Sequence, residues 1–267
     1  MRKKFGHALR LGVAQDALAL VETRRWGVDA VLVAELALDT SHAFPAALAA
    51  GAAELFNGAQ RDRWPLTVVL ADELARMWQV VAPPECARMA DLEAAAALRF
   101  QQLYGEPAAG WQVGADWQLQ RPFLAAALPH SLMAALQQAG GAHAMQMIEV
   151  APQFIALFNR WRSELAAGDW FGVVHDGVLT LGVCDGGIVA MRAVAVAAPA
   201  NAAWLGAHVA REALRLNLPA PKRLRLCGAV PPAWAVAPDC VLLGQAAGDA
   251  TSAWSPAALL ALSGSAL

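Results

Sequence analysis

Apolar runs broken by short polar turns organise the start of the chain. Three consecutive runs have the composition and alternation of β-strands, and short breaks at Gln15-Asp16 and Trp26-Gly27 separate them. A helical pattern follows, in which Leu48, Ala52 and Leu55 share one face, and then a continuous apolar run typical of a buried strand. The strands are expected at His7–Ala14, Ala17–Arg25, Val28–Leu38 and Leu66–Ala71, and the helix between Pro45 and Gly58.

The same order of patterns returns after Gly168. The breaks at Asp176-Gly177 and at residues 185–187 have the residues that favour tight hairpins. A helix that carries Leu205 and Val209 on one stripe follows, and then a second buried strand. These elements are expected at Trp170–His175, Val178–Cys184, Ile188–Ala197, a helix after Pro199, Lys222–Cys227, a strand near Cys240–Leu243 and a helix from Pro256. The sequence thus predicts two copies of one βββαβ unit.

A segment of mixed pattern, opened by Pro83-Pro84, lies between the two units. Just before it, Asp72 is expected to cap a short helix that runs from Glu73 to Trp78. Within and after it we expect a helix at Met89–Tyr104, strands at Gly110–Leu119 and Phe123–Leu128, a helix at Ser131–Ala139, a strand at Ala144–Val150 and a helix at Pro152–Ala166.

Mixed sheets built from such units, with helices packed on them, predict an α/β protein of two lobes with a cleft between them. The fold class is therefore expected to be a duplicated βββαβ architecture with an inserted α/β segment. The expected division is a first subdomain over residues 1–82, an inserted subdomain over 83–150 that completes the first lobe, and a second lobe over 151–267.

Composition narrows the class of protein. Apolar residues make up 58% of the chain and charged residues 16%, but 63 of the 267 residues are alanine, which favours helix and tight packing without forming a lipid-exposed span. We therefore expect a soluble protein. A net charge of −2 gives no electrostatic footprint for nucleic acid. Four scattered cysteines predict reduced thiols rather than disulfides or a metal site.

Known catalytic motifs are absent from the sequence. It has no GxxxxGK[ST], GxGxxG, HExxH or GxSxG, and its six histidines have no metal-ligand spacing. No catalytic residue and no metal ligand is therefore predicted, and function has to be approached through architecture and resemblance.

Three short segments carry a family resemblance. The strand pair from Leu11 to Glu22, the sequence LADELAR at Leu70–Arg76 and FNRWR at Phe158–Arg162 resemble the PilM family of type IV pilus assembly proteins. The cytoplasmic domain of the GspL family of type II secretion proteins is similar. Both are branches of the actin-like ATPase superfamily, whose two-lobed, ribonuclease H-like fold contains duplicated βββαβ units. The resemblance covers most of the chain in order.

The resemblance implies a nucleotide site at three turns, and this sequence departs from the pattern at each. The family's first phosphate turn has an acid shortly after the strand glycine Gly12, where this chain has Ala14. Asp16 is then either a displaced acid or an ordinary hairpin residue. The second phosphate turn would be Asp176-Gly177, which also reads as a two-residue hairpin.

The third turn, which in the family contacts adenosine, retains Gly228 but has Ala229 where backbone must approach the base closely. If ATP and Mg²⁺ are bound, the resemblance implies contacts from Gly12, Asp16, Asp176, Gly177 and Gly228. The three altered turns instead predict a pseudo-ATPase without a bound cofactor.

Partner binding is the function that the resemblance favours. Related PilM proteins bind a short peptide of their membrane partner beside the inserted segment, and Trp111, Trp117 and Trp161 lie in or next to that segment here. The resemblance implies a non-catalytic scaffold at the cytoplasmic face of the inner membrane that binds an inner-membrane pilus or secretion assembly protein, with no membrane span of its own. The alternative is an active ATPase or small-molecule kinase of the same fold.

Overall fold

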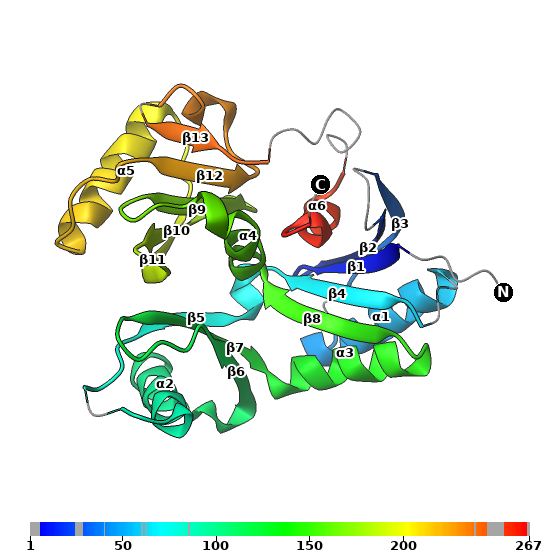
Figure 1. The fold of residues 1–267 in the computed structure, drawn as a ribbon. Coiled ribbons are helices and arrows are strands. Elements are labelled where there is room, and N and C mark those ends of the chain that lie inside the picture. Colours follow the sequence, from blue (N-terminus) through cyan, green and yellow to red (C-terminus); the bar gives the residue numbers. More distant parts are fainter. Residues whose placement is uncertain are drawn as a thin grey trace.

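A computed structural model describes residues 6–24, 29–39, 41–59, 61, 63–84, 86–237, 239–244 and 254–265. It contains two five-stranded sheets and one three-stranded sheet, each covered by helices (Figure 1). The predicted break at Trp26-Gly27 lies outside the described residues.

The first sheet has the strand order β3-β2-β1-β4-β8. The three strands nearest the start of the chain are antiparallel, and β4 and β8 run parallel to β1. Helices α1 and α3 cover one face, where Leu9, Leu11 and Val13 are fully buried. The elements are β1 (His7–Val13), β2 (Ala17–Arg24), β3 (Ala30–Ala37), α1 (Phe44–Ala59), β4 (Pro65–Leu70), α3 (His130–Ala142) and β8 (Gln146–Pro152).

The second sheet repeats this arrangement in the order β11-β10-β9-β12-β13. Again three antiparallel strands are followed by strands parallel to the first of them. Helix α5 packs on this sheet through Leu205 and Val209, and Trp234 of a short 3₁₀ turn is completely buried beside it. The elements are β9 (Trp170–His175), β10 (Val178–Cys184), β11 (Ile188–Ala195), α5 (Ala202–Arg215), β12 (Leu224–Gly228) and β13 (Cys240–Leu242). The predicted duplication is confirmed.

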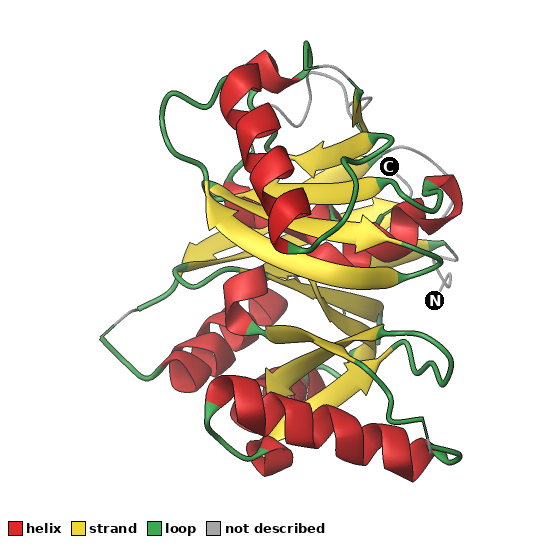
Figure 2. Ribbon diagram, turned by 90° about the vertical axis from the view of Figure 1, so that its left-hand side faces the viewer, coloured by secondary structure: helices red, strands yellow, loops and turns green. Residues whose placement is uncertain are grey.

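The third sheet, in the order β5-β7-β6, packs on helix α2. Its elements are β5 (Arg76–Val80), α2 (Met89–Tyr104), β6 (Trp111–Ala115) and β7 (Phe123–Pro129). In the turned view the second sheet lies above it, with α5 in front of the second sheet and α2 below the third (Figure 2). Because β5 pairs with β7, the division at residue 82 places two strands of one sheet on opposite sides of a boundary. That division stays a prediction.

The predicted helix from Glu73 to Trp78 is wrong. Only Asp72–Leu74 forms a 3₁₀ turn, and the following residues form β5. Trp78 is opposite Ala125 of β7 and its ring lies 5.1 Å from that of Phe100. Cross-strand pairing and burial of the indole therefore override the local helical pattern.

Two helices connect the lobes at the centre of the molecule (Figure 1). Helix α4 (Gln153–Trp161) follows β8 directly, and helix α6 (Pro256–Leu262) packs on the face of β1 and β2 opposite α1. Among the described residues, no helix is both long and apolar enough to cross a membrane. The four cysteines are free thiols, of which Cys184 and Cys227 are buried and Cys86 and Cys240 are half-buried.

Candidate functional site

Both predicted phosphate turns are two-residue hairpins. In the first, the N–H of Ala14 donates to the carbonyl of Ala17 at 2.9 Å, which leaves Gln15 and Asp16 as the loop. In the second, Asp176 and Gly177 have φ angles of 43° and 70°, as a type I′ turn requires. The hairpin interpretation of both breaks is therefore confirmed. A phosphate contact at either one remains a prediction.

The first turn is packed against helix α6. A Cβ atom at Gly12 would overlap the carbonyl oxygen of Ala257, so the strand and the helix are in backbone contact. Ala14 is only 8% exposed and packs in a cluster with Ala257 and Ala258. Asp16 is exposed on the turn. The strand glycine and the residue at the expected acid position are thus covered by the protein itself.

Helix α6 is fixed in this position by a half-buried arginine. The Arg10 guanidinium donates two hydrogen bonds of 2.6 Å, to the carbonyl oxygens of Ala261 and Ser263. Cationic groups are favoured at a helix C-terminus, where carbonyl groups lack intrahelical partners. Burial lowers the pKa of Arg10, and the nearby Glu149 opposes that shift.

An interlobe cavity of about 390 Å³ lies between α6, α4 and the second sheet. Asp176, Gly177 and Gly228 line it, so three of the five residues implied for a nucleotide come together here. Gly12 and Asp16 are not among the described residues that line it. Of the residues implied for a nucleotide, those of the second lobe therefore lie together at this cavity, and those of the first lobe do not line it.

Gln153 is the polar group of this cavity that sequence reasoning missed. Its Nε2 atom donates to the hydroxyl of Ser263 at 3.0 Å, while its Oε1 atom is buried and has no partner among the described residues. A buried unpaired acceptor is costly, so this oxygen is available to a hydrogen-bond donor that enters the cavity.

Gly228 has a structural reason to be glycine. Its φ is 87°, and a Cβ atom there would overlap the carbonyl oxygen of Val174. The same oxygen accepts a hydrogen bond of 2.8 Å from the N–H of Ala229. The turn therefore needs a glycine to close against β9 whether or not a ligand is bound.

Asp72 joins the two lobes, which sequence reasoning also missed. One carboxylate oxygen accepts a 2.9 Å hydrogen bond from the N–H of Phe154 in the first turn of α4. The other lies 3.5 Å from the hydroxyl of Thr180 on β10. Burial raises the pKa of Asp72 to about 7, with a smaller contribution from Glu73, although the hydrogen bonds oppose the shift. Asp72 thus caps a helix distant in sequence instead of its own turn.

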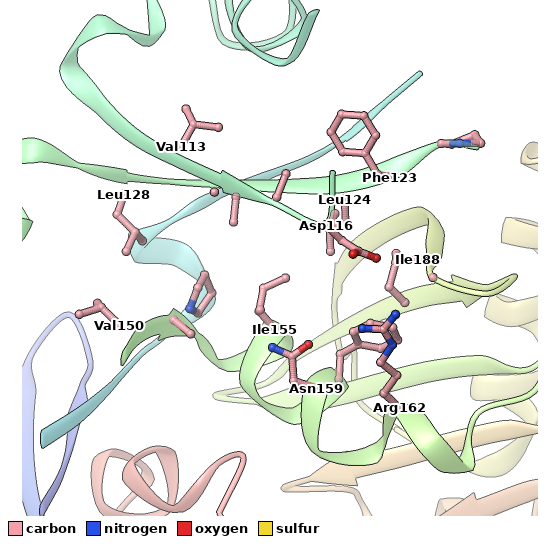
Figure 3. A pocket seen from close by; sticks show the side chains of 18 of the residues that line it. Val113, Asp116, Phe123, Leu124, Leu128, Val150, Ile155, Asn159, Arg162 and Ile188 are labelled. Atoms are coloured by element: carbon pink, nitrogen blue, oxygen red, sulfur yellow. The ribbon is translucent and has the colours of Figure 1, made fainter. Parts of the chain in front are cut away.

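A second cavity, the insert groove, runs between the three-stranded sheet, the end of β8 and helix α4, with a volume of about 400 Å³. Ile155, Asn159 and Arg162 extend from α4 and its 3₁₀ extension toward the sheet (Figure 3). Val113 and Phe123 point to the other side of the sheet. The groove combines an apolar floor with charged groups at one end, where Asp116 lies.

The three candidate tryptophans do not share one surface. Trp111 and Trp117 are half-buried on the α2 side of the sheet, with ring centroids 5.4 Å from Phe100 and 5.6 Å from Phe123. Trp161 lines the interlobe cavity instead. Their role in binding a partner remains a prediction.

Comparisons with known proteins establish the fold. No protein-family model matches the sequence, and no curated protein matches it. Among solved structures, a PilM-PilN type IV pilus biogenesis complex matches with a TM-score of 0.55 at 18% identity, over 83% of this chain and 81% of that one. The cytoplasmic domain of EpsL, an inner membrane component of the type II secretion system of Vibrio cholerae, matches with a TM-score of 0.53 at 13% identity, over 90% and 86%.

A protein of unknown function from Bacteroides thetaiotaomicron, described as having an actin-like ATPase fold, matches with a TM-score of 0.55 at 12% identity, over 85% of this chain and 84% of that one. Together with the duplicated sheets, these similarities show that the chain has the actin-like ATPase fold and resembles PilM and EpsL in structure. The predicted fold class is confirmed.

Proposed function

We propose that this protein is a non-catalytic scaffold that binds a segment of an inner-membrane protein in a type IV pilus or type II secretion-type assembly. It would act at the cytoplasmic face of that membrane. The insert groove is the observation that carries the proposal, because it is concave, largely apolar and bordered by an edge strand. Structural likeness to a PilM-PilN complex and to EpsL supports an assembly role.

The insert groove has the features of a peptide-binding site. Strand β6 forms one edge of its sheet, so backbone groups along it can pair with an added strand. Leu124, Leu128 and Ile155 supply apolar surface for side chains, and Asn159 and Arg162 can fix the orientation of a polar backbone. An extended segment with apolar side chains on one face would bury those chains between the sheet and α4.

Nucleotide phosphates fit this chain poorly, and we propose that ATP and Mg²⁺ are not its cofactors. Each hairpin loop contains two residues, so few N–H groups are free to surround a phosphate. Ala14 supplies no carboxylate for a hydrated metal, and its side chain packs against α6. If a nucleotide were held, the base would lie beside Gly228 and Gln153 in the interlobe cavity.

An active ATPase or small-molecule kinase of the same fold is the second candidate. The interlobe cavity favours it, because the unpaired oxygen of Gln153 borders that cavity and Asp176 lines it. Asp72, with a pKa near 7, would be a suitable general base if it faced a substrate, but its two oxygens are directed at Phe154 and Thr180.

Thermal unfolding with Mg-ATP separates the two candidates. A ligand present at 100 times its Kd adds about 2.7 kcal/mol to stability, which raises Tm by roughly 5–10 °C in a chain of this size. For the scaffold we expect a change below about 1 °C with Mg-ATP and with Mg-tripolyphosphate, the control for ionic effects. A rise of several degrees with Mg-ATP alone would overturn the proposal in favour of the enzyme.

Site-specific cross-linking tests the insert groove. A photoreactive amino acid at exposed Asn159 is expected to cross-link, in cells of the source organism, to an inner-membrane pilus or secretion component identified by mass spectrometry. The same group at Gln101, exposed on α2 outside the groove, is the matched control.

Asn159→Trp, which fills the groove, should reduce recovery of that component roughly tenfold, or about 1.4 kcal/mol of binding. Equal cross-linking from both positions would contradict a site in the groove.

A further inference from the structure

A third cavity, the edge groove, lies where the three-stranded sheet faces the second lobe. It runs between β5, helix α2 and strand β11 of the second lobe, and its volume is about 690 Å³. Consecutive residues line it on both sides, from Met77 to Val81 and from Ala190 to Arg192. Both β5 and β11 stand at the end of their sheets. The groove is therefore bordered by the backbones of two edge strands.

The direction of the β5 backbone can be read from one hydrogen bond. The hydroxyl of Tyr104 donates to the carbonyl oxygen of Met77 at 3.1 Å, so this carbonyl points away from β7. Backbone groups of successive strand residues alternate in direction, and those of residues two apart agree. The N–H and C=O of Gln79 therefore face the edge groove, where an added strand can pair with them.

The charge of the edge groove has one sign. Arg99 of α2 and Arg192 of β11 are the charged groups among the described residues that line it, with no aspartate or glutamate. Arg99 hydrogen-bonds the side-chain oxygen of Gln102 at 3.4 Å, and Arg192 lies 3.7 Å from the buried carboxylate of Glu212. A carboxylate of a ligand could therefore pair with Arg99, because no acidic side chain among the described lining residues already occupies that guanidinium.

Exposed apolar side chains complete the surface. Leu98 and Val81 both line the edge groove, and they are 59% and 69% exposed to solvent. An occupant of the groove would bury them. A ligand that offers apolar side chains would cover both of these groups.

We propose that the edge groove binds, by strand addition to β5, an extended segment of a partner protein that carries acidic side chains between apolar ones. The segment pairs with Gln79, places a carboxylate near Arg99 and covers Leu98 and Val81. This partner is separate from the segment proposed for the insert groove, which lies against β6 at the opposite edge of the same sheet.

Binding of two designed peptides tests the charge and the mode of binding. The probes are a fluorescently labelled peptide of alternating valine and glutamate and its counterpart of alternating valine and lysine, measured by anisotropy with the full chain. We expect the glutamate peptide to bind at least about tenfold more tightly, with an affinity that falls as salt is added. Arg99→Glu should reverse the preference. Equal affinity of the two peptides, or no binding of either, would overturn the proposal.

Two substitutions at one position test the backbone contact. Gln79→Pro removes the N–H that faces the groove without removing a bond to β7, and proline is tolerated at the outer edge of a sheet. Gln79→Ala removes the same side chain and keeps the N–H, so it is the matched control. We expect the proline variant to weaken glutamate-peptide binding at least about tenfold and the alanine variant to change it less than twofold. Equal effects of the two variants would reject strand addition.

Hydrogen exchange shows which groove the peptide occupies, and ultracentrifugation shows whether a second copy of this chain occupies the edge groove instead. Saturation with the glutamate peptide should slow exchange of the Gln79 amide and leave β6 amides unchanged. Protection along β6 instead would assign the peptide to the insert groove and overturn the inference. A concentration-dependent dimer that Gln79→Pro abolishes would identify a second copy of this chain as the occupant, and would equally overturn it.

Discussion

Gly12→Ala is expected to lower the free energy of unfolding by about 3 kcal/mol or more. The new methyl group would overlap the carbonyl oxygen of Ala257 and crowd the N–H of Ala261, which are both backbone atoms of α6. Neither can rotate aside as a side chain can, so the helix must move away from β1 or the strand must bend. Urea unfolding measures the loss, and faster amide exchange in residues 257–262 would locate it in α6.

Gly58→Ala is the matched control for this experiment. Gly58 lies near the end of α1, and a Cβ atom there meets no other atom within 4 Å. Alanine in a helix is favoured over glycine by about 0.5–1 kcal/mol, so this variant should be slightly stabilised. A Gly12→Ala variant that unfolds like Gly58→Ala would contradict the packing of α6 on β1.

The second large effect is a change in pH dependence on replacing Asp72 by asparagine. The pKa of Asp72 rises from 3.8 to about 7 on folding, mainly because the carboxyl is buried. A raised folded pKa means that the folded state holds its proton more tightly, so the stabilisation is complete below the unfolded pKa and is lost as pH rises through 7. Asparagine keeps an acceptor for the N–H of Phe154 and cannot ionise.

From pH 5 to pH 8, the stability of Asp72→Asn relative to the unmodified protein should therefore increase by about 2.5 kcal/mol. Urea unfolding at several pH values measures this difference. Thr180→Val is the control, because the hydroxyl it removes lowers the pKa of Asp72, and its loss should leave the pH dependence intact or make it steeper. Curves for Asp72→Asn and the unmodified protein that stay parallel would show that Asp72 does not titrate in this range.

Local chemistry explains why much of the fold can be predicted from the sequence. Asp176-Gly177 favours one tight turn by its own conformational preferences, and the flanking apolar runs belong to strands whose faces are both covered. The order of such elements then repeats, so the duplication is visible without long-range information. The strand order within each sheet follows the same repetition.

The failures concern elements whose form depends on distant residues. Strand β5 is only five residues long and becomes a strand because it pairs with β7, more than forty residues later. Asp72 has the sequence position of a local cap, yet the donor it meets belongs to Phe154. No local pattern distinguishes these outcomes from a short capped helix.

The candidate site could be predicted only in part for a similar reason. The sequence identifies the turns at Asp16 and Asp176, but not the helix that covers the first of them. Gly12 was the available signal, because a glycine inside a strand often marks the close approach of another backbone. The insert groove and the edge groove each combine segments from different parts of the chain, so their lining cannot be read from spacing along it.

The position of α6 also determines when the first lobe can be completed during synthesis on the ribosome. The hydrogen bond from Arg10 to Ala261 spans 251 residues, so the α6 side of β1 has no cover until nearly all of these residues have been translated. The nascent first sheet can gain α1 and α3 on one face while its other face is still open to water. An apolar face left open in this way favours association of nascent chains, and the first sheet, although translated before the second, can be completed only after it.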